Sequence, residues 1–277
     1  TPCKYFVTCV QTAPQCNQSA ESKKRLDAFK KELLLEEHRQ PVILVGMGTC
    51  GLANGAQKVF DALAAELKKK NINAKLVATG CVGYCSREVI VDVKLPGSGR
   101  ISYAEVKPED VERIIDETVM QKNLLTDKVL GVYTDGPHNG WKDVPSMQQV
   151  PFFAKQKKLV LENCGVIDPE SIDQYLARGG YRGLSQVLNT MKPQEVIQNM
   201  LKAGLRGRGG GGFPTGKKWE LAARSKGDEK YLICNADEGD PGAFMDRAVL
   251  EGDPHRIIEG MVIAAYAIGA SHGYIYC

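Results

Sequence analysis

The segment from residue 41 to residue 120 alternates apolar runs with amphipathic stretches, and this order restricts the fold more than any other feature. Apolar runs rich in Val and Ile predict strands, and residues 55–71 place apolar side chains at helical spacing. A second helix is predicted to open with Pro108, at its first turn, and to reach Met120. The predicted strands cover residues 41–47, 74–80, 88–95 and 100–106. This order predicts a compact α/β unit.

The remaining sequence predicts three further segments. Residues 1–40 form an N-terminal helical extension, with a helix over residues 21–40. Residues 121–150 are polar and broken by Asp-Gly, Asn-Gly and two prolines, so we expect a linker there. Residues 151–277 form a second domain. Its predicted elements are a strand at 158–164, helices at 169–179, 181–191 and 193–204, a helix from about Lys217, a strand at 230–237, a helix at 254–270 that is buried on all sides, and a strand at 273–277.

Charge and hydropathy indicate a cytoplasmic protein. The chain has 36 Lys and Arg against 33 Asp and Glu, and the two signs are interleaved, which predicts neither nucleic-acid binding nor a membrane surface. The longest apolar run, residues 261–270, is about half of what a bilayer requires, and the start lacks the features of a signal peptide. Because the chain starts at Thr1 and ends on an apolar strand, we expect a piece of a longer protein.

The stretch GLRGRGGGGFPTGKKW, residues 204–219, has the composition of a phosphate-binding loop. It matches the letters of a P-loop, but Lys218 stands where a Ser or Thr would bind magnesium, and Pro214 removes an amide donor. It also matches a dinucleotide fingerprint, but the segment before it is helical instead of a strand. Glycines let backbone amides approach a phosphate, and a helix that begins near Lys217 presents further amides. The positive charges are Arg206, Arg208, Lys217 and Lys218.

A second polar loop, NADEGDPGAFMDR, follows the predicted strand at 230–237. Open α/β sheets bind ligands at the carboxyl ends of their strands. Asn235, Asp237, Glu238 and Asp240 are suited to bind the hydroxyls of a ribityl or ribose chain and the polar edge of a heterocycle. Together the two loops predict a mononucleotide site, for example for FMN.

The second domain resembles the FMN-bearing, NADH-oxidising subunit of complex I and its relatives in soluble hydrogenases and formate dehydrogenases. The matching stretches are residues 151–181, 204–219 and 231–247. The resemblance implies a Rossmann-like FMN- and NADH-binding α/β domain, of which this chain holds the N-terminal part. It implies that FMN contacts Gly207, Arg208, Gly209, Gly210, Lys218, Asn235, Asp237 and Glu238.

The resemblance further implies that NADH lies against the flavin beside Phe213. A second Phe is expected where this chain has Leu221, and Asp240 is expected near the nicotinamide. Hydride transfer between NAD(H) and FMN requires positioning more than acid or base catalysis, so we assign no catalytic proton donor or acceptor. The expected activity is that of an NADH dehydrogenase. The alternative is a non-catalytic electron-transfer or assembly module that holds no FMN.

Relatives of this family pass single electrons to iron-sulfur centres of partner subunits in a multisubunit redox complex. They also carry a 4Fe-4S site, which we expect only beyond Cys277. The resemblance does not separate hydrogenase, formate dehydrogenase and quinone-linked complexes, nor NADH from NADPH.

Nine cysteines without a secretion signal favour metal binding or buried thiols over disulfides. Cys50, Cys81 and Cys85 follow predicted strands, and this part resembles the thioredoxin-like 2Fe-2S ferredoxin domain of hydrogenase-type relatives. That family has C-x4-C followed by C-x3-C, but the partner expected for Cys50 falls at Val45 or Gly46.

A 2Fe-2S cluster requires four ligands. Three alternatives therefore stay open. The fourth ligand comes from Cys3, Cys9 or Cys16, or the domain has lost its cluster and serves as a docking surface, or the thiols bind zinc or another metal.

The other side chains that could bind metal are expected to have ordinary structural roles. Cys164, Cys234 and Cys277 lie in apolar contexts and are predicted to be core residues. The four histidines, at positions 38, 138, 255 and 272, are scattered, so we predict surface or capping roles for them.

Overall fold

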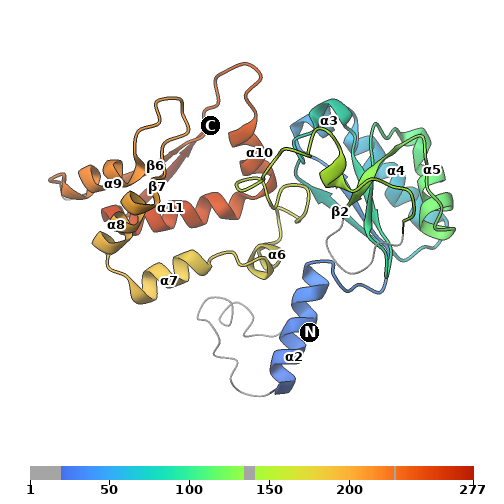
Figure 1. The fold of residues 1–277 in the computed structure, drawn as a ribbon, viewed down its shortest axis with the longest axis horizontal. Coiled ribbons are helices and arrows are strands. Elements are labelled where there is room, and N and C mark those ends of the chain that lie inside the picture. Colours follow the sequence, from blue (N-terminus) through green and yellow to red (C-terminus); the bar gives the residue numbers. More distant parts are fainter. Residues whose placement is uncertain (1–19, 134–140, 228) are drawn as a thin grey trace.

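The computed structural model describes residues 20–133, 141–227 and 229–277. It has two units: a five-stranded sheet with its helices, and a mainly helical unit with a two-stranded sheet (Figure 1). The predictions for Cys3, Cys9 and Cys16, and that for His138, lie outside the described residues. Within the described ranges, no helix has the length and the apolar composition required to span a membrane.

The first unit is built on strands in the order β2-β1-β3-β4-β5. Their bounds are β1 Val42–Gly46, β2 Lys75–Thr79, β3 Val91–Lys94, β4 Arg100–Tyr103 and β5 Val129–Tyr133. Strands β1 and β2 run parallel, and the other neighbours are antiparallel. A parallel pair joined by a helix and followed by an antiparallel hairpin is the core arrangement of the thioredoxin-like fold, as predicted.

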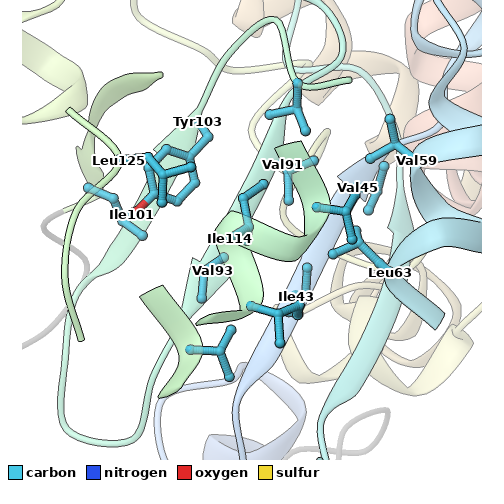
Figure 2. Packing of buried hydrophobic residues seen from close by; sticks show 14 of the residues in the cluster. Ile43, Val45, Val59, Leu63, Val91, Val93, Ile101, Tyr103, Ile114 and Leu125 are labelled. Carbon is cyan, nitrogen blue, oxygen red and sulfur yellow. The ribbon is translucent and has the colours of Figure 1, made fainter. Parts of the chain in front are cut away.

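Side-chain alternation along the strands separates two apolar layers. Ile43 and Val45 of β1 face one way and pack with α4, Ala56–Lys69, whose buried residues Val59 and Leu63 lie one turn apart (Figure 2). Val42 and Leu44 face the opposite way, in a smaller cluster with Leu35 and Val77. The main core therefore lies between the sheet and α4, with further side chains from the helical segment 108–120.

The predicted helix 108–120 forms as consecutive turns of different pitch. These are a 3₁₀ turn Pro108–Asp110, an α-helical turn α5 Val111–Arg113 and a π-helix Ile114–Met120. The remaining elements of this unit are α2 Ala20–Leu33, α3 Thr49–Ala53 and a 3₁₀ turn Cys85–Arg87. Helix α2 ends seven residues before the predicted end at Gln40, and the buried Leu35 adopts a positive φ of 58° there.

The segment 121–150 is more than the expected linker, because it contributes to the first sheet. Strand β5 pairs with β4 in antiparallel register. Trp141 is 7% exposed, packs in the main core and donates a hydrogen bond from Nε1 to the Gly99 carbonyl oxygen at 2.8 Å. The sequence analysis did not predict β5, because turn residues surround a strand of only 5 residues. The domain boundaries themselves stay a prediction.

The second unit consists of helices packed around α11. Its elements are α6 Ile172–Ala177, α7 Arg182–Thr190, α8 Pro193–Ala203, α9 Thr215–Arg224, β6 Tyr231–Asn235, α10 Met245–Gly252, α11 Pro254–Ile268 and β7 His272–Tyr276. Val187, Val196 and Ile197 pack with Ala267 of α11 in the core of this unit. Strands β6 and β7 pair in parallel and are connected through α10 and α11.

Two predictions for this unit were wrong, and one helix was not predicted. The stretch 158–164 forms turns instead of a strand, with Leu159 and Val160 64% and 49% exposed, because no neighbouring strand among the described residues pairs with it. Helix α11 is not buried on all sides: Ile258 and Val262 are each 40% exposed, since a two-stranded sheet covers little of it. The sequence analysis predicted no helix at α10, which overlaps the polar loop 235–247 only at residues 245–247.

The two units meet where α10 lies against the loop that follows β2 (Figure 1). A Cβ atom on Gly80 would lie 2.4 Å from the Gly252 Cα atom, a distance that real structures do not tolerate. Arg100 donates from Nη1 to the Gly165 carbonyl oxygen at 3.1 Å, and Tyr84 stacks on Phe152 with a centroid distance of 4.0 Å. The junction is therefore close-packed backbone with polar and aromatic contacts around it.

We expect Gly80→Ala to destabilise the protein by about 1–3 kcal/mol, because the added methyl group must displace the backbone of Gly252. Urea unfolding followed by circular dichroism measures this. Gly260→Ala is the matched control, because a Cβ atom there meets nothing within 4 Å in the middle of a helix, and it should leave stability unchanged or slightly higher. Equal midpoints for the two variants would contradict this account of the junction.

Candidate flavin and cysteine sites

The glycine loop is a closed hairpin between α8 and α9. Helix α8 ends at Gly204 with a φ of 66°, and the Gly207 amide donates to the Phe213 carbonyl oxygen at 2.9 Å. Gly216 lets α9 pack against α8, because a Cβ atom there would lie 2.5 Å from the Leu201 nitrogen. Both ends of the loop are thereby held in place.

The face of the loop is open. Cβ atoms on Gly209, Gly210 and Gly211 would meet no described atom within 4 Å. Of these three positions, only 210 has a backbone conformation that favours glycine, because the φ of Gly210 is 90°. Contacts within the described part of the chain therefore do not explain the other two glycines, whereas close approach of a ligand to the backbone would explain them.

The four positive charges of the loop have different partners. Arg206 donates from Nε to the Gly212 carbonyl oxygen at 2.5 Å and so closes the loop itself. Lys217 forms an ion pair with Glu220 at 2.7 Å. Arg208 and Lys218 are exposed and form no ion pair with the described residues. These two side chains are the ones that remain available for a phosphate.

The loop after β6 contains the other predicted flavin contacts. Asn235 accepts a hydrogen bond from the Asp237 amide through Oδ1 at 3.3 Å, and Asp237 and Asp240 are exposed. Both β6 and α9 pack against α11, so the polar loop and the glycine loop belong to the same unit. Phe213 and Leu221, at the two positions predicted to stack on NADH, are 49% and 51% exposed.

Glu238 has a structural role that the sequence did not predict. Its carboxylate accepts hydrogen bonds from the Asp246 and Arg247 amides at 3.0 and 3.2 Å, at the N-terminus of α10. Desolvation opposes ionisation, but these amides outweigh it and lower the pKa of Glu238. The contact of Glu238 with flavin stays a prediction. The hydrogen bonds to the Asp246 and Arg247 amides account for the position of its side chain.

The cysteine site brings together the three thiols that the sequence singled out. Cys50 lies in α3, Cys81 follows β2, and Cys85 begins a 3₁₀ turn. Cys81 and Cys85 have their Sγ atoms 3.8 Å apart. With residues of α10 the three line a cavity of about 210 Å³, and the α10 side chains include Met245, Arg247 and Glu251.

Glu251 connects α10 to the start of α3. Its Oε2 accepts from the Thr49 amide at 2.9 Å, and its Oε1 accepts from the Thr49 hydroxyl. Nothing in the sequence indicated this contact, because the two residues are 202 positions apart.

Burial favours the protonated form of the Cys50 and Cys81 thiols. Desolvation, together with Cys85, raises the pKa of Cys50 to about 11, although the positive charge of Arg247 acts in the opposite direction. Desolvation also raises the pKa of Cys81, and the nearby Glu88 carboxylate adds to the shift. Without a cation between them, the thiols of Cys50 and Cys81 are therefore poor nucleophiles at neutral pH.

The donor set fits three positions of a 2Fe-2S cluster, which requires four. All six cysteines of the described ranges are free thiols, and Cys164, Cys234 and Cys277 are not among the residues that line the cavity. Within those ranges, no group of three or more His, Cys, Asp or Glu side chains already has the arrangement of a metal-ion site. The three thiols line one cavity, but they are not arranged around a single metal position.

The other predictions for cysteine and histidine have mixed outcomes. Cys164 is buried, as predicted, but Cys234 is half-buried and Cys277 is exposed, because β6 and β7 have no further layer over them among the described residues. His255 is partly buried and bonds through Nδ1 to the Tyr181 hydroxyl at 2.9 Å, which is more than a surface role. His38 and His272 form hydrogen bonds with residues close in sequence, Gln40 and Ser271, and the ring centroid of His272 also lies 5.6 Å from that of Tyr231.

We expect Glu238→Gln to lower stability by about 0.5–1 kcal/mol above pH 5, because the helix N-terminus loses a negative charge. Because the pKa of Glu238 is lowered in the folded state, its carboxylate stabilises the wild-type protein above the ordinary value of 4.5. This stabilisation disappears as pH falls below that value. Urea midpoints at pH 7 and pH 3.5 measure this. Asp240→Asn, in the same loop but exposed, is the control, and an equal effect at both pH values would contradict the capping role.

We expect iodoacetamide at pH 8 to alkylate Cys277 at least about tenfold faster than Cys50 or Cys81 in the native, metal-free protein. Peptide mass spectrometry over a time course gives the rates. In 8 M urea the three rates should converge, which controls for local sequence. Rapid native labelling of Cys81 would show that the thiols are not buried as described.

Comparison with known proteins supports the sequence motifs. Residues 200–277 match the family model described as the Nuo51 FMN-binding domain. A subunit of the NADP-reducing hydrogenase of Solidesulfovibrio fructosivorans, HndC, is 61% identical over 122 residues, which are 44% of this chain and 24% of that protein. One subunit of the NADH-quinone oxidoreductase of Aquifex aeolicus is 57% identical over 106 residues, 38% of this chain and 24% of that protein. The chain thus spans about a quarter of the length of these relatives.

Two solved structures are also similar. The thioredoxin-like [2Fe-2S] ferredoxin from Aquifex aeolicus aligns with 38% of this chain and 99% of its own, at 20% identity and a TM-score of 0.31. An NAD+-reducing [NiFe]-hydrogenase aligns with 98% of this chain and 45% of its own, at 20% identity and a TM-score of 0.32. These scores are too low to carry an argument, so the thioredoxin-like fold rests on the strand order of the sheet. Residues 200–277, which contain the glycine loop and the polar loop after β6, are thus the part of the chain that is similar to the Nuo51 FMN-binding domain.

Proposed function

We propose that this chain is part of an NADH:acceptor oxidoreductase in which hydride passes between NAD(H) and FMN and single electrons pass on to iron-sulfur centres. The observation that carries the proposal is the open glycine loop, with two cations that pair with no described residue, inside the segment that matches the FMN-binding family. These cations are Arg208 and Lys218. The names of the relatives, NADP-reducing hydrogenase and NADH-quinone oxidoreductase, support the reaction class.

The residues of this chain would act by binding and positioning. Backbone amides of Gly209 and Gly210, with Arg208 and Lys218, would hold the FMN phosphate, because exposed amides and fixed positive charge favour a dianion. Gly207, whose amide donates to Phe213, would contact FMN through the rest of its backbone. Asn235 and Asp237 would bind the ribityl hydroxyls and the flavin edge. Phe213 offers an exposed ring on which the nicotinamide would stack. Asp240 would lie near the nicotinamide. FMN itself supplies the hydride-accepting ring.

The partners in this proposal are iron-sulfur subunits of a multisubunit complex, and the location is the cytoplasm. Free thiols at all six described cysteines support a reducing compartment. A 4Fe-4S centre would belong to a further domain of the full-length protein. The alternative, a module that never holds FMN, makes the opposite prediction for flavin binding.

The experiment is an anaerobic visible spectrum of the protein after incubation with FMN and desalting, recorded before and after addition of NADH. We expect flavin bands that stay with the protein and bleach on reduction. Protein without retained flavin would favour the non-catalytic module, and the same measurement on the full-length protein would separate that outcome from an incomplete site. Retained flavin that NADH does not bleach would contradict the hydride-transfer step.

We expect Lys218→Glu to weaken FMN binding at least about tenfold, because a carboxylate would replace an ammonium group beside the phosphate. Fluorescence quenching of FMN measures the dissociation constant. Lys226→Glu has the same charge change on an exposed lysine outside the loop and should leave binding within about twofold of wild type. Equal affinities for the two variants would remove Lys218 from the proposed site.

A further inference from the structure

The space beside Gly46 is filled by a carboxylate. The ferredoxin-type pattern expects a second thiol at Val45 or Gly46, but Val45 is fully buried in the core against α4. A Cβ atom on Gly46 would point elsewhere, to 3.3 Å from Oε2 and 3.5 Å from Oε1 of Glu88. The Glu88 side chain therefore occupies the space into which a side chain at position 46 would extend.

Glu88 is held in this place by two hydrogen bonds. Its Oε1 accepts from the Cys81 thiol, with an Oε1 to Sγ distance of 3.3 Å, and its Oε2 accepts from the Ile90 amide at 2.9 Å. The residue is buried, at 8% exposure. The adjacent Arg87 does not neutralise it, because that guanidinium pairs with Glu105 at 2.8 Å.

Glu88 is thus a buried carboxylate in direct contact with the thiol of Cys81. No Lys, Arg or His within the described ranges forms an ion pair with Glu88. A buried carboxylate without a cation is costly when ionised. A metal centre removes this cost, because it supplies positive charge to the carboxylate and to the thiolates at once.

We propose that Glu88 supplies the fourth donor of a 2Fe-2S centre held by Cys50, Cys81 and Cys85. An ionised carboxylate carries the same single negative charge as a thiolate, so the exchange leaves the charge of the centre unchanged. Iron-sulfur clusters accept a non-thiolate ligand in place of Cys, as histidine-ligated centres demonstrate. Binding requires that the side chains, which now hydrogen-bond to one another, turn towards a common centre.

This inference rests on the iron-sulfur part of the proposed function, and it does not depend on FMN. It differs from the alternative in which a cysteine of residues 1–19 is the fourth ligand. It also differs from ligation by Glu251, the carboxylate that lines the cysteine cavity. The experiment therefore compares variants at all three places.

The protein is reconstituted anaerobically with ferric iron and sulfide, desalted, and analysed for iron, acid-labile sulfide and the EPR spectrum after dithionite reduction. We expect about two iron atoms per chain in the wild type. Glu88→Gln retains an acceptor for the Ile90 amide, so it should fold normally, but its iron content should fall at least about fivefold. Glu88→Cys should load iron and give altered EPR g-values, because the donor atom changes.

The controls are Glu251→Gln and a triple variant with serine at Cys3, Cys9 and Cys16, both of which should load iron as the wild type does. Full loading of Glu88→Gln with the wild-type EPR spectrum would overturn the inference, as would loss of iron in either control while Glu88→Gln stays loaded. Wild-type protein that takes up no iron would overturn the inference together with the iron-sulfur part of the proposed function. Flavin retention and its bleaching by NADH, measured on the same samples, test the FMN and hydride-transfer part separately.

Discussion

The close approach of Gly80 to Gly252 is the contact on which the arrangement of both candidate sites depends. Gly80 immediately precedes Cys81, and Gly252 is the last residue of α10, so backbone packs on backbone where the two units meet. The absence of two side chains allows α10 to lie over the thiols and form a wall of their cavity. With larger residues there, close packing would be lost before any hydrogen bond across the junction could form.

Helix α10 therefore belongs to both sites. Glu238, in the polar loop that we propose for flavin, binds the amides at its N-terminus, while Arg247 and Glu251 on its side line the cysteine cavity. The helix has only 8 residues. A short, capped helix with close-packed backbone at its far end has little freedom to move independently of either loop. The two sites are thus connected by one rigid element.

Electrostatics in the cysteine cavity follow from this arrangement. Burial raises the pKa of Cys50 and so disfavours its thiolate, and the guanidinium of Arg247 from α10 partly compensates. The second unit therefore contributes to the charge environment of thiols that belong to the first. On the inner side, Glu88 adds negative charge beside Cys81, so only a cation at the centre would allow all the donors to ionise together.

Much of the first unit could be predicted from the sequence, because strands β1 to β4 and helix α4 carry their own apolar pattern. Ile43 and Val45 alternate with Val42 and Leu44, and the period identifies the strand without any knowledge of its neighbours. Two segments differ from the prediction because pairing with a neighbouring strand, which local periodicity does not show, decides whether they form strands. Residues 158–164 are apolar enough for a strand but have no partner among the described residues, whereas β5 pairs with β4 although turn residues surround it.

Residue type and spacing alone identified the candidate site segments: a glycine loop with basic residues, a polar loop after β6, and three cysteines that follow strands. Four contacts became visible only in the folded chain. Arg206 closes its own loop, Glu238 caps α10, Glu251 reaches Thr49, and Glu88 fills the space beside Gly46. Each of these roles depends on which backbone amide, carbonyl or empty space lies next to the side chain, and that neighbour is set by packing between segments distant in the sequence.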